Sequence, residues 1–120
     1  MSEYQKTRLL DIVTHLMNQG FSTYLPGKHQ GECTAEYVVV KTGVTTQVNN
    51  YSSTVTYYDV MCYVPRATPS RLDEFVDEVT EAMKGLNPMI RPTYQVTDAY
   101  YDDEVKAHMK SITYINYRKV

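Results

Sequence analysis

The sequence predicts an α+β domain: a single antiparallel or mixed β-sheet, two amphipathic helices packed on one face of it, and a projecting β-hairpin. Two segments of the 120-residue chain carry apolar residues at helical spacing, and most other apolar residues fall in β-branched or tyrosine-rich runs typical of strands. Between residues 41 and 60 the residues are strand-forming, but the middle is too polar to pack into a core. Since only two helices cover the grouped strands, placing both on one sheet face is the economical arrangement. At this length we expect one domain, residues 1–120.

The first predicted helix covers residues 4–18. Gly20 follows it, where a residue in the left-handed conformation commonly ends a helix. The apolar residues that recur at helical spacing are Leu9, Ile12, Val13, Leu16 and Met17.

The second predicted helix lies in "ATPSRLDEFVDEVTEAMKGLNP" and is closed by Pro88. Ser70 is a candidate amino-terminal cap, with Asp73 three residues on. The acidic residues opposite the apolar stripe are expected to form a solvated face. The stripe, which we expect to face the sheet, consists of Leu72, Phe75, Val76, Val79, Met83 and Leu86.

Five strands are predicted. The first is short, lies in "FSTYL" and is stopped by Pro26; the others cover residues 35–41, 53–65, 93–101 and 105–119. In the third of these strands, alternation places one set of residues on the face expected to be buried in the core: Tyr58, Val60, Cys62 and Val64.

The polar segment between the second and third strands is expected to form a hairpin or loop at about residues 42–56 that projects from the core. Its valines and threonines form strands well, and paired asparagines tolerate the left-handed backbone of a tight reversal. A disordered loop is the alternative. The residues that we expect to make subunit contacts are Val44, Thr46, Val48, Asn49, Asn50 and Tyr51.

Charge and composition exclude several classes of protein. Twelve basic and fourteen acidic residues provide no polycationic surface for nucleic acid. The amino terminus has no signal-peptide apolar segment, and no run approaches the roughly 18 apolar residues that span a bilayer. We therefore expect a cytoplasmic protein without membrane contact. The two cysteines, Cys33 in a polar loop and Cys62 in a strand, are expected to be free thiols.

A search for catalytic motifs finds none. His15, His29 and His108 have no local motif around them, and His15 is better explained as a partly buried packing residue. There is no metal-ligand spacing, and the five glycines form no phosphate-binding loop. We expect no enzymatic activity, no metal and no cofactor.

Tyrosine is unusually frequent: there are twelve tyrosines, two phenylalanines and no tryptophan. A ring with one hydroxyl suits a surface that is wet alone and buried in a complex, although β-propensity on a half-exposed sheet explains the same count. The tyrosines proposed as possible further interface residues are Tyr57, Tyr63, Tyr100 and Tyr101.

The order of these elements, together with the local sequence of several segments, resembles the tail-terminator proteins of tailed bacteriophages over nearly the whole chain. The segments that carry the resemblance are "EYVVVK", "DVMCYVP" followed by "RLDEFVDEVTEAM", and the closing "SITYINYRK". The family has a pattern of residue types and spacing and no invariant catalytic motif. Neighbouring head-to-tail joining proteins share much of the same fold.

The resemblance implies a structural protein of the virion tail or neck, assembled in the host cytoplasm. Such proteins form a homo-oligomeric ring, typically a hexamer, that caps the tail tube, stops its polymerisation and presents a surface to the head connector or neck protein. DNA passes through the ring without specific binding, which the slightly negative net charge of −2 would suit. The same role exists in phage-tail-like bacteriocins.

Two other readings stay open beside the ring. One is another neck or head-completion protein of the same fold. The other is a small α+β ligand-binding or adaptor domain, because a sheet with helices on one face serves many functions. A ligand-binding domain would have a concave pocket with convergent polar groups, for example around His108 and Tyr114.

Overall fold

A computed structural model describes residues 3–28, 31–48, 53–87 and 89–119 of the chain. The fold is α+β, with one mixed sheet and two α-helices, and the molecule measures 48 × 26 × 24 Å. The helices are α1 (Glu3–Asn18) and α2 (Arg71–Met83), and a short 3-10 helix, η1 (Lys84–Leu86), continues α2. The strands are β1 (Thr23–Tyr24), β2 (Tyr37–Val48), β3 (Ser53–Pro65), β4 (Arg91–Val96), β5 (Tyr100–Asp102) and β6 (Ala107–Lys119).

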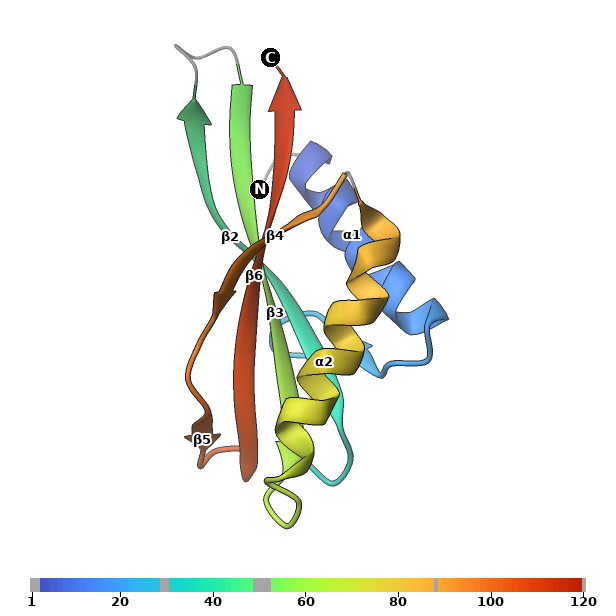
Figure 1. Ribbon diagram of the computed structural model, residues 1–120, viewed down its shortest axis with the longest axis vertical. Helices are drawn as coiled ribbons and strands as arrows, with labels where there is room; N and C mark the ends of the chain where they lie inside the picture. The colour runs from blue at the N-terminus through green and yellow to red at the C-terminus, as the bar shows by residue number, and fades with distance from the viewer. Residues whose placement is uncertain (1–2, 29–30, 49–52, 88, 120) are drawn as a thin grey trace.

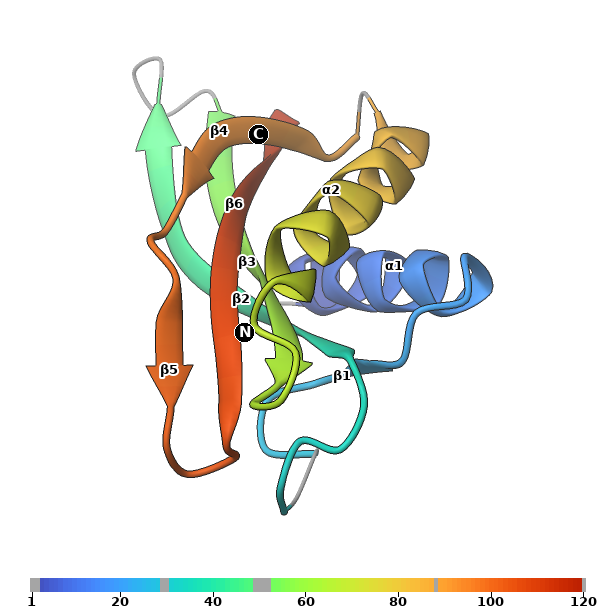
Figure 2. The same ribbon diagram turned by 60° about the horizontal axis from the view of Figure 1, so that its bottom comes forward.

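The sheet has the strand order β1-β2-β3-β6-β4, and β5 pairs with β6 beside β4 (Figure 1, Figure 2). Among the described strands, only β1 runs parallel to its neighbour; the other pairings are antiparallel. The long central strand β3 pairs with β6 along its whole length, from Ser53↔Lys119 to Pro65↔Ala107. The three long strands β2, β3 and β6 therefore form the frame of the domain.

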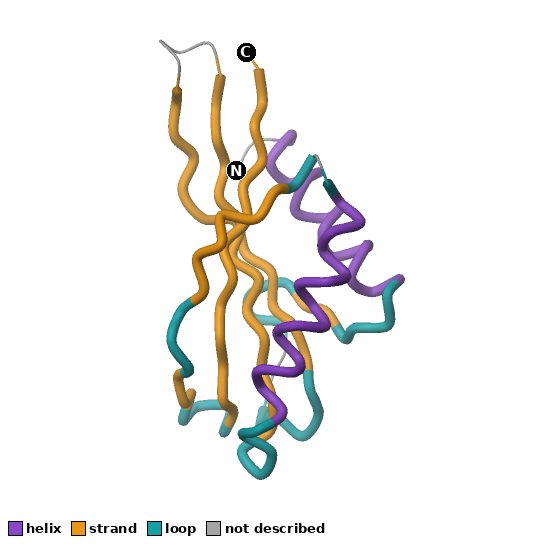
Figure 3. The backbone as a smooth tube through the Cα atoms, in the orientation of Figure 1, coloured by secondary structure: helices purple, strands orange, loops and turns teal. Residues whose placement is uncertain are grey.

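The main core lies between the helices and one set of alternating strand residues. Figures 1 and 3 show α1 and α2 on the same side of the sheet, and Phe21 of the α1–β1 turn packs on Phe75 of α2 with ring centroids 5.9 Å apart. The strand residues of this core, all buried, are Val38, Val40, Tyr58, Val60, Cys62, Val64, Ile112 and Tyr114. The predicted buried face of β3 is confirmed, because its four residues are fully inaccessible.

A smaller cluster covers part of the opposite face of the sheet. Tyr37 of β2 and Tyr63 of β3 are stacked with ring centroids 4.7 Å apart, and Tyr24 meets Tyr37 edge-on at 5.7 Å. Cys33 packs into the same cluster, where its amide donates to Val105 O at 2.7 Å. The segment before β2 therefore packs on this face. Cys33 is buried although its neighbours in the sequence are polar.

The predicted helices are confirmed, with three corrections of detail. Gly20 ends α1 at φ +95, with Phe21 N donating to Leu16 O at 3.0 Å. Met17, expected among the apolar contacts of α1, is 57% exposed. Ser70 precedes α2 but makes no capping hydrogen bond through its side chain, because its backbone is already helical. Leu86 is only partly buried, since the chain has tightened into η1 there.

The predicted strand at residues 93–101 divides into β4 and β5, and β6 begins two residues later than predicted. The division follows from an irregularity in β4 between Pro92 and Gln95, where Tyr94 adopts φ +63. Thr93 holds the chain through this irregularity: its hydroxyl donates to Thr113 O at 2.8 Å and accepts from Gln95 N at 3.2 Å. A side chain therefore replaces the missing ladder contacts.

Candidate interaction surface

The polar segment predicted between residues 42 and 56 is part of the sheet up to Val48 and again from Ser53. β2 continues without a break to Val48, and the pairing with β3 runs to Val48↔Ser53. The predicted contact residues Val44, Thr46 and Val48 all lie in β2, and Thr46 is exposed. Asn49, Asn50 and Tyr51 lie outside the described residues.

Beside the predicted hairpin, β6 supplies a third strand, so the ends of β2 and β3 are not an isolated pair. Val55 pairs with Thr46 on one side and with Tyr117 on the other, and the same arrangement holds along the end of the sheet. Residues 45–48, 53–56 and 116–119 together form what we call the distal sheet. The three strands reach one end of the long axis side by side (Figure 1, Figure 3). The third strand adds backbone pairing to a two-stranded arrangement that is marginal in water by itself.

A β-bulge separates the distal sheet from the part of β2 that packs in the core. The register of β2 against β3 shifts by one residue between Thr42 and Thr45. Gly43 sits in this bulge, where a Cβ atom would lie 3.2 Å from Tyr57 O, closer than most side chains tolerate. Glycine therefore suits this close backbone approach, and the bulge changes which side chains of β2 face each way.

A groove runs beside the outer edge of β2 at this bulge. Its walls are Leu9 of α1, Leu25 and Pro26 of the segment after β1, and the backbone around Gly43. Leu9 is buried and Pro26 is exposed, so the groove opens from the core to the surface. An extended segment laid along this edge would find apolar contacts as well as backbone partners.

The four tyrosines proposed as further interface residues are not gathered on one surface. Tyr63 is 9% exposed and belongs to the cluster with Tyr37, so little of it is available to a partner. Tyr57 is half-buried in β3, while Tyr100 and Tyr101 are exposed on β5, at the other end of β6 from the distal sheet. Tyr101 contacts His108 with ring centroids 5.1 Å apart.

Two other tyrosines are exposed, one in the distal sheet and one at the irregularity of β4. Tyr117 lies in the distal sheet, is 50% exposed, and has the guanidinium of Arg91 5.7 Å above its ring. Tyr94, at the irregularity of β4, is 87% exposed. Sequence reasoning placed both in strands but could not single them out, because the exposure of Tyr94 depends on the irregularity that turns it outward.

A pocket of about 250 Å³ lies between α2, β4 and β6, and is lined by Thr80, Met83, Tyr94 and Tyr114 among others. Burial raises the pKa of Tyr114 to about 12, and its hydroxyl lies near Thr80 without a hydrogen bond to any described residue. His108, which the ligand-binding reading placed beside Tyr114, does not line this pocket. The pocket is mostly apolar, with no converging set of titratable groups.

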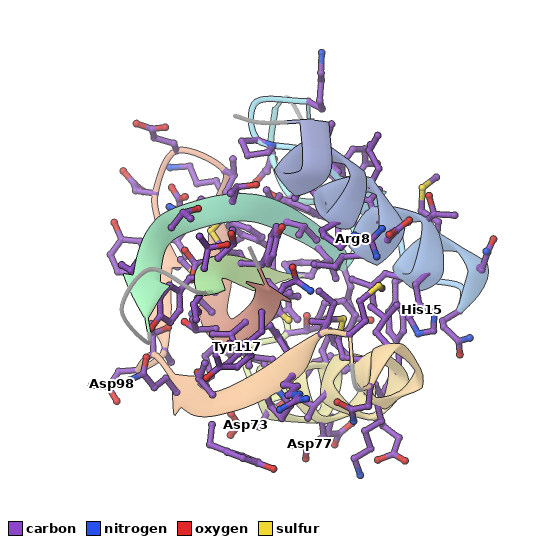
Figure 4. All side chains as sticks on the ribbon, turned by 90° about the horizontal axis from the view of Figure 1, so that it is seen from above. Arg8, His15, Asp73, Asp77, Asp98 and Tyr117 are labelled. Carbon is purple, nitrogen blue, oxygen red and sulfur yellow. The ribbon has the colours of Figure 1, made fainter. Side chains whose placement is uncertain are left out.

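The titratable side chains serve packing and surface contacts. His15 Nε2 is 2.7 Å from Ala82 O and joins α1 to the carboxyl-terminal end of α2 (Figure 4). Both cysteines are free and buried, as predicted for Cys62, and burial raises the pKa of the Cys62 thiol to about 12. Within the described ranges, no three His, Cys, Asp or Glu side chains gather as a metal site would require, and no helix is long and apolar enough to cross a membrane.

The acidic face of α2 is solvated, as predicted, and part of it surrounds one arginine. Figure 4 shows Asp73 and Asp77 on the outer side of the helix. Arg71 contacts Glu36 at 2.5 Å, Glu78 at 2.5 Å and Glu74 at 3.1 Å. The hydrogen bond from Arg71 lowers the pKa of Glu78. This cluster fastens the segment before β2 to the start of α2 and contains no group placed for proton transfer.

The surface best placed for a partner is therefore the distal sheet with the adjacent groove. In comparisons with known proteins, no family model and no curated protein matches the sequence.

Proposed function

We propose that this chain is a structural virion protein that forms a ring, hexameric in the family it resembles, capping a phage tail tube. The ring ends tube polymerisation and provides the surface for head-tail joining. In this proposal both helices lie on one face of the sheet, and the hairpin between β2 and β3 is the projecting arm that contacts the next subunit. The partners are further copies of the chain, the tail tube protein and a head-tail connector or neck protein.

The observation that carries the proposal is the contrast between the polar character of the distal sheet and its regular strand pairing. Thr45 Oγ1 and Thr56 Oγ1 meet across the strands at 3.1 Å, and Thr46 is exposed. Thr45 and Thr46 contribute little burial to their own subunit, yet β2 is extended and paired to its end at Val48. A surface of this kind suits contact between subunits.

Native mass spectrometry of the purified chain, followed by addition to purified tail tubes, tests this function. We expect a closed ring and tubes whose growth stops when the ring is added. A chain that stays monomeric at high concentration and does not cap tubes would contradict the proposal. A ring that binds connectors but leaves tube growth unaffected would favour another neck or head-completion protein.

The pocket beside Tyr114 is the specific observation that favours a second candidate, a ligand-binding α+β domain. Thermal shift against a library of small apolar compounds tests it. Stabilisation that disappears in Met83→Trp, which fills the pocket, would favour ligand binding; no stabilisation by any compound would count against it.

A further inference from the structure

The distal sheet has two outer edges, and no described strand covers either of them. On the β2 side, β1 pairs only with Val38 and Val39, far from the end of the strand. On the β6 side, β4 reaches no further than Ile115, opposite Arg91. Residues 46–48 of β2 and 116–119 of β6 therefore form the two margins of the sheet. Edges of this kind are ready templates for pairing with another chain.

The two edges are suited to each other. β2 and β6 are both antiparallel to β3, so they run in the same direction along the molecule. A second copy placed beside the first, in the same orientation, sets its β6 edge against the β2 edge of the first. The sheet then continues as a parallel pair, in which backbone hydrogen bonds form without any special side chain.

We infer that copies of this chain join head-to-tail by adding the β6 edge of one copy, residues 116–119, to the β2 edge of the next, residues 46–48. The inference deepens the proposed ring by naming the two surfaces in contact, and rests on the proposed function only for closure of the ring. The groove lined by Leu9, Leu25 and Pro26 borders the β2 edge and adds apolar contact for the neighbouring copy.

A head-to-tail contact accounts for both edges, whereas a two-fold contact does not. Two copies related by a two-fold axis would pair β2 with β2, which leaves the β6 edge of each copy uncovered. The same applies to β6 pairing with β6. A heterologous contact covers one edge of each kind at every junction, and repeated contacts of this kind close into a ring or continue as a filament.

Cysteine cross-linking tests the inference directly. Thr46 and Tyr117 are exposed, and both are in register with Val55, so their side chains share one face of the distal sheet. Within one copy Thr46 and Tyr117 lie about 10 Å apart across β3, so the two cysteines are placed in different copies. T46C and Y117C are co-expressed, so that both enter one assembly, and treated with a bismaleimide linker that tolerates an offset of two residues, about 7 Å along a strand. Each variant alone serves as a control, as does T46C co-expressed with Y100C, whose site is exposed at the other end of β6.

We expect T46C co-expressed with Y117C to form a covalent dimer that neither variant forms alone. The three controls, checked for native circular dichroism, should remain monomeric under denaturing conditions, as should wild type, whose own thiols are buried. Dimers from T46C alone would overturn the inference in favour of a two-fold contact.

The same experiment separates this inference from the proposed function. If native mass spectrometry shows a ring but T46C co-expressed with Y117C gives no covalent dimer, the edge pairing is wrong and the ring proposal stands. If the dimer forms but the assembly does not cap tail tubes, the edge pairing stands and the tail-terminator function is wrong. If no species larger than a monomer forms at any concentration, both are wrong.

Discussion

The same three strands pass through two regions of this protein that are stabilised in different ways. In the helix-covered region, alternate residues of β2, β3 and β6 are buried against α1 and α2, as Val40, Tyr58 and Tyr114 illustrate. In the distal sheet the strands keep their pairing, but Thr46 and Tyr117 are exposed. The first region is stabilised by side-chain burial. In the distal sheet Val55, Thr56 and Asn116 are buried as well, but β2 presents Thr45 and Thr46 to solvent, so this part of β2 is held mainly by backbone hydrogen bonds.

This difference separates folding from assembly along a single strand. A fully buried large side chain contributes about 1.5 to 3 kcal/mol, whereas a hydrogen bond contributes about 1 kcal/mol net. The free energy of folding therefore comes chiefly from the covered region. The exposed β2 part of the distal sheet can change with little effect on the fold, which leaves its edge available for contacts with other chains.

The largest expected effect is in the covered region. Tyr58 is fully buried, so Tyr58→Ala should lower the free energy of unfolding by about 3 to 5 kcal/mol, as for other large aromatic residues in cores. Its half-buried neighbour Tyr57 is the matched control, and Tyr57→Ala should cost less than half as much. Urea denaturation measures both. Equal losses would mean that the two faces of β3 contribute alike, and would contradict the larger contribution of the face buried against the helices.

Deleting residues 44–53 and joining the strands by a short turn should have a smaller effect on folding. The deletion removes the distal pairing between β2 and β3, a few backbone hydrogen bonds worth about 1 kcal/mol each. The core side chains stay in place, so we expect a cooperative thermal transition at a modestly lower temperature, and no assembly. A broad, non-cooperative transition would show that the covered region depends on the distal sheet.

A third prediction concerns the contact that holds α1 against α2 in the covered region. A Cβ atom on Gly85 would lie 2.7 Å from His15 Cε1, so Gly85→Ala must displace the ring and its hydrogen bond to Ala82 O. Gly85→Ala is expected to lower the free energy of unfolding by about 1 kcal/mol. In a His15→Ala background the same change should be neutral or stabilising, since alanine favours helical backbone. Urea denaturation of wild type, the two single variants and the double variant gives the coupling free energy between the two positions. If the two changes in the free energy of unfolding simply add, the contact is ruled out.

The smallest expected effect is at the exposed cluster around Arg71. Because the hydrogen bond from Arg71 lowers the pKa of Glu78, ionised Glu78 stabilises the folded state at pH values above its unfolded pKa. That contribution is lost as the pH falls through the lower, folded pKa. The stability difference between wild type and Arg71→Gln should therefore be full at neutral pH and shrink below about pH 4.5.

Thermal melts between pH 3 and pH 7 measure this difference. Arg71→Lys keeps the positive charge and should recover part of the stability that Arg71→Gln loses. A difference that grows towards low pH would contradict the assignment.

Much of the covered region could be predicted from the sequence because burial there follows regular periods. The stripe of α2 and the alternation of β3 were recovered almost residue by residue, since a helix and a strand each repeat their buried positions. Met17 was misplaced because it lies at the edge of the apolar stripe of α1, where spacing alone does not decide exposure.

The candidate surface was only partly predictable. The sequence located the polar segment in β2 and β3, but not the third strand, because the pairing of β6 with β3 joins residues far apart in the chain. The bulge at Gly43 and the irregularity at Tyr94 are also consequences of strand register, which local propensity does not encode. Tyr63 carries the same kind of side chain as the exposed tyrosines, yet it is buried by a segment that begins at Cys33.

The separation of folding from assembly is tested most directly by measuring particle mass for the full chain and for the variant lacking residues 44–53, at matched concentration, by light scattering after size-exclusion chromatography. We expect a closed ring for the full chain and a folded monomer for the variant. A full chain that remains monomeric, or a variant that still forms the ring, would contradict it.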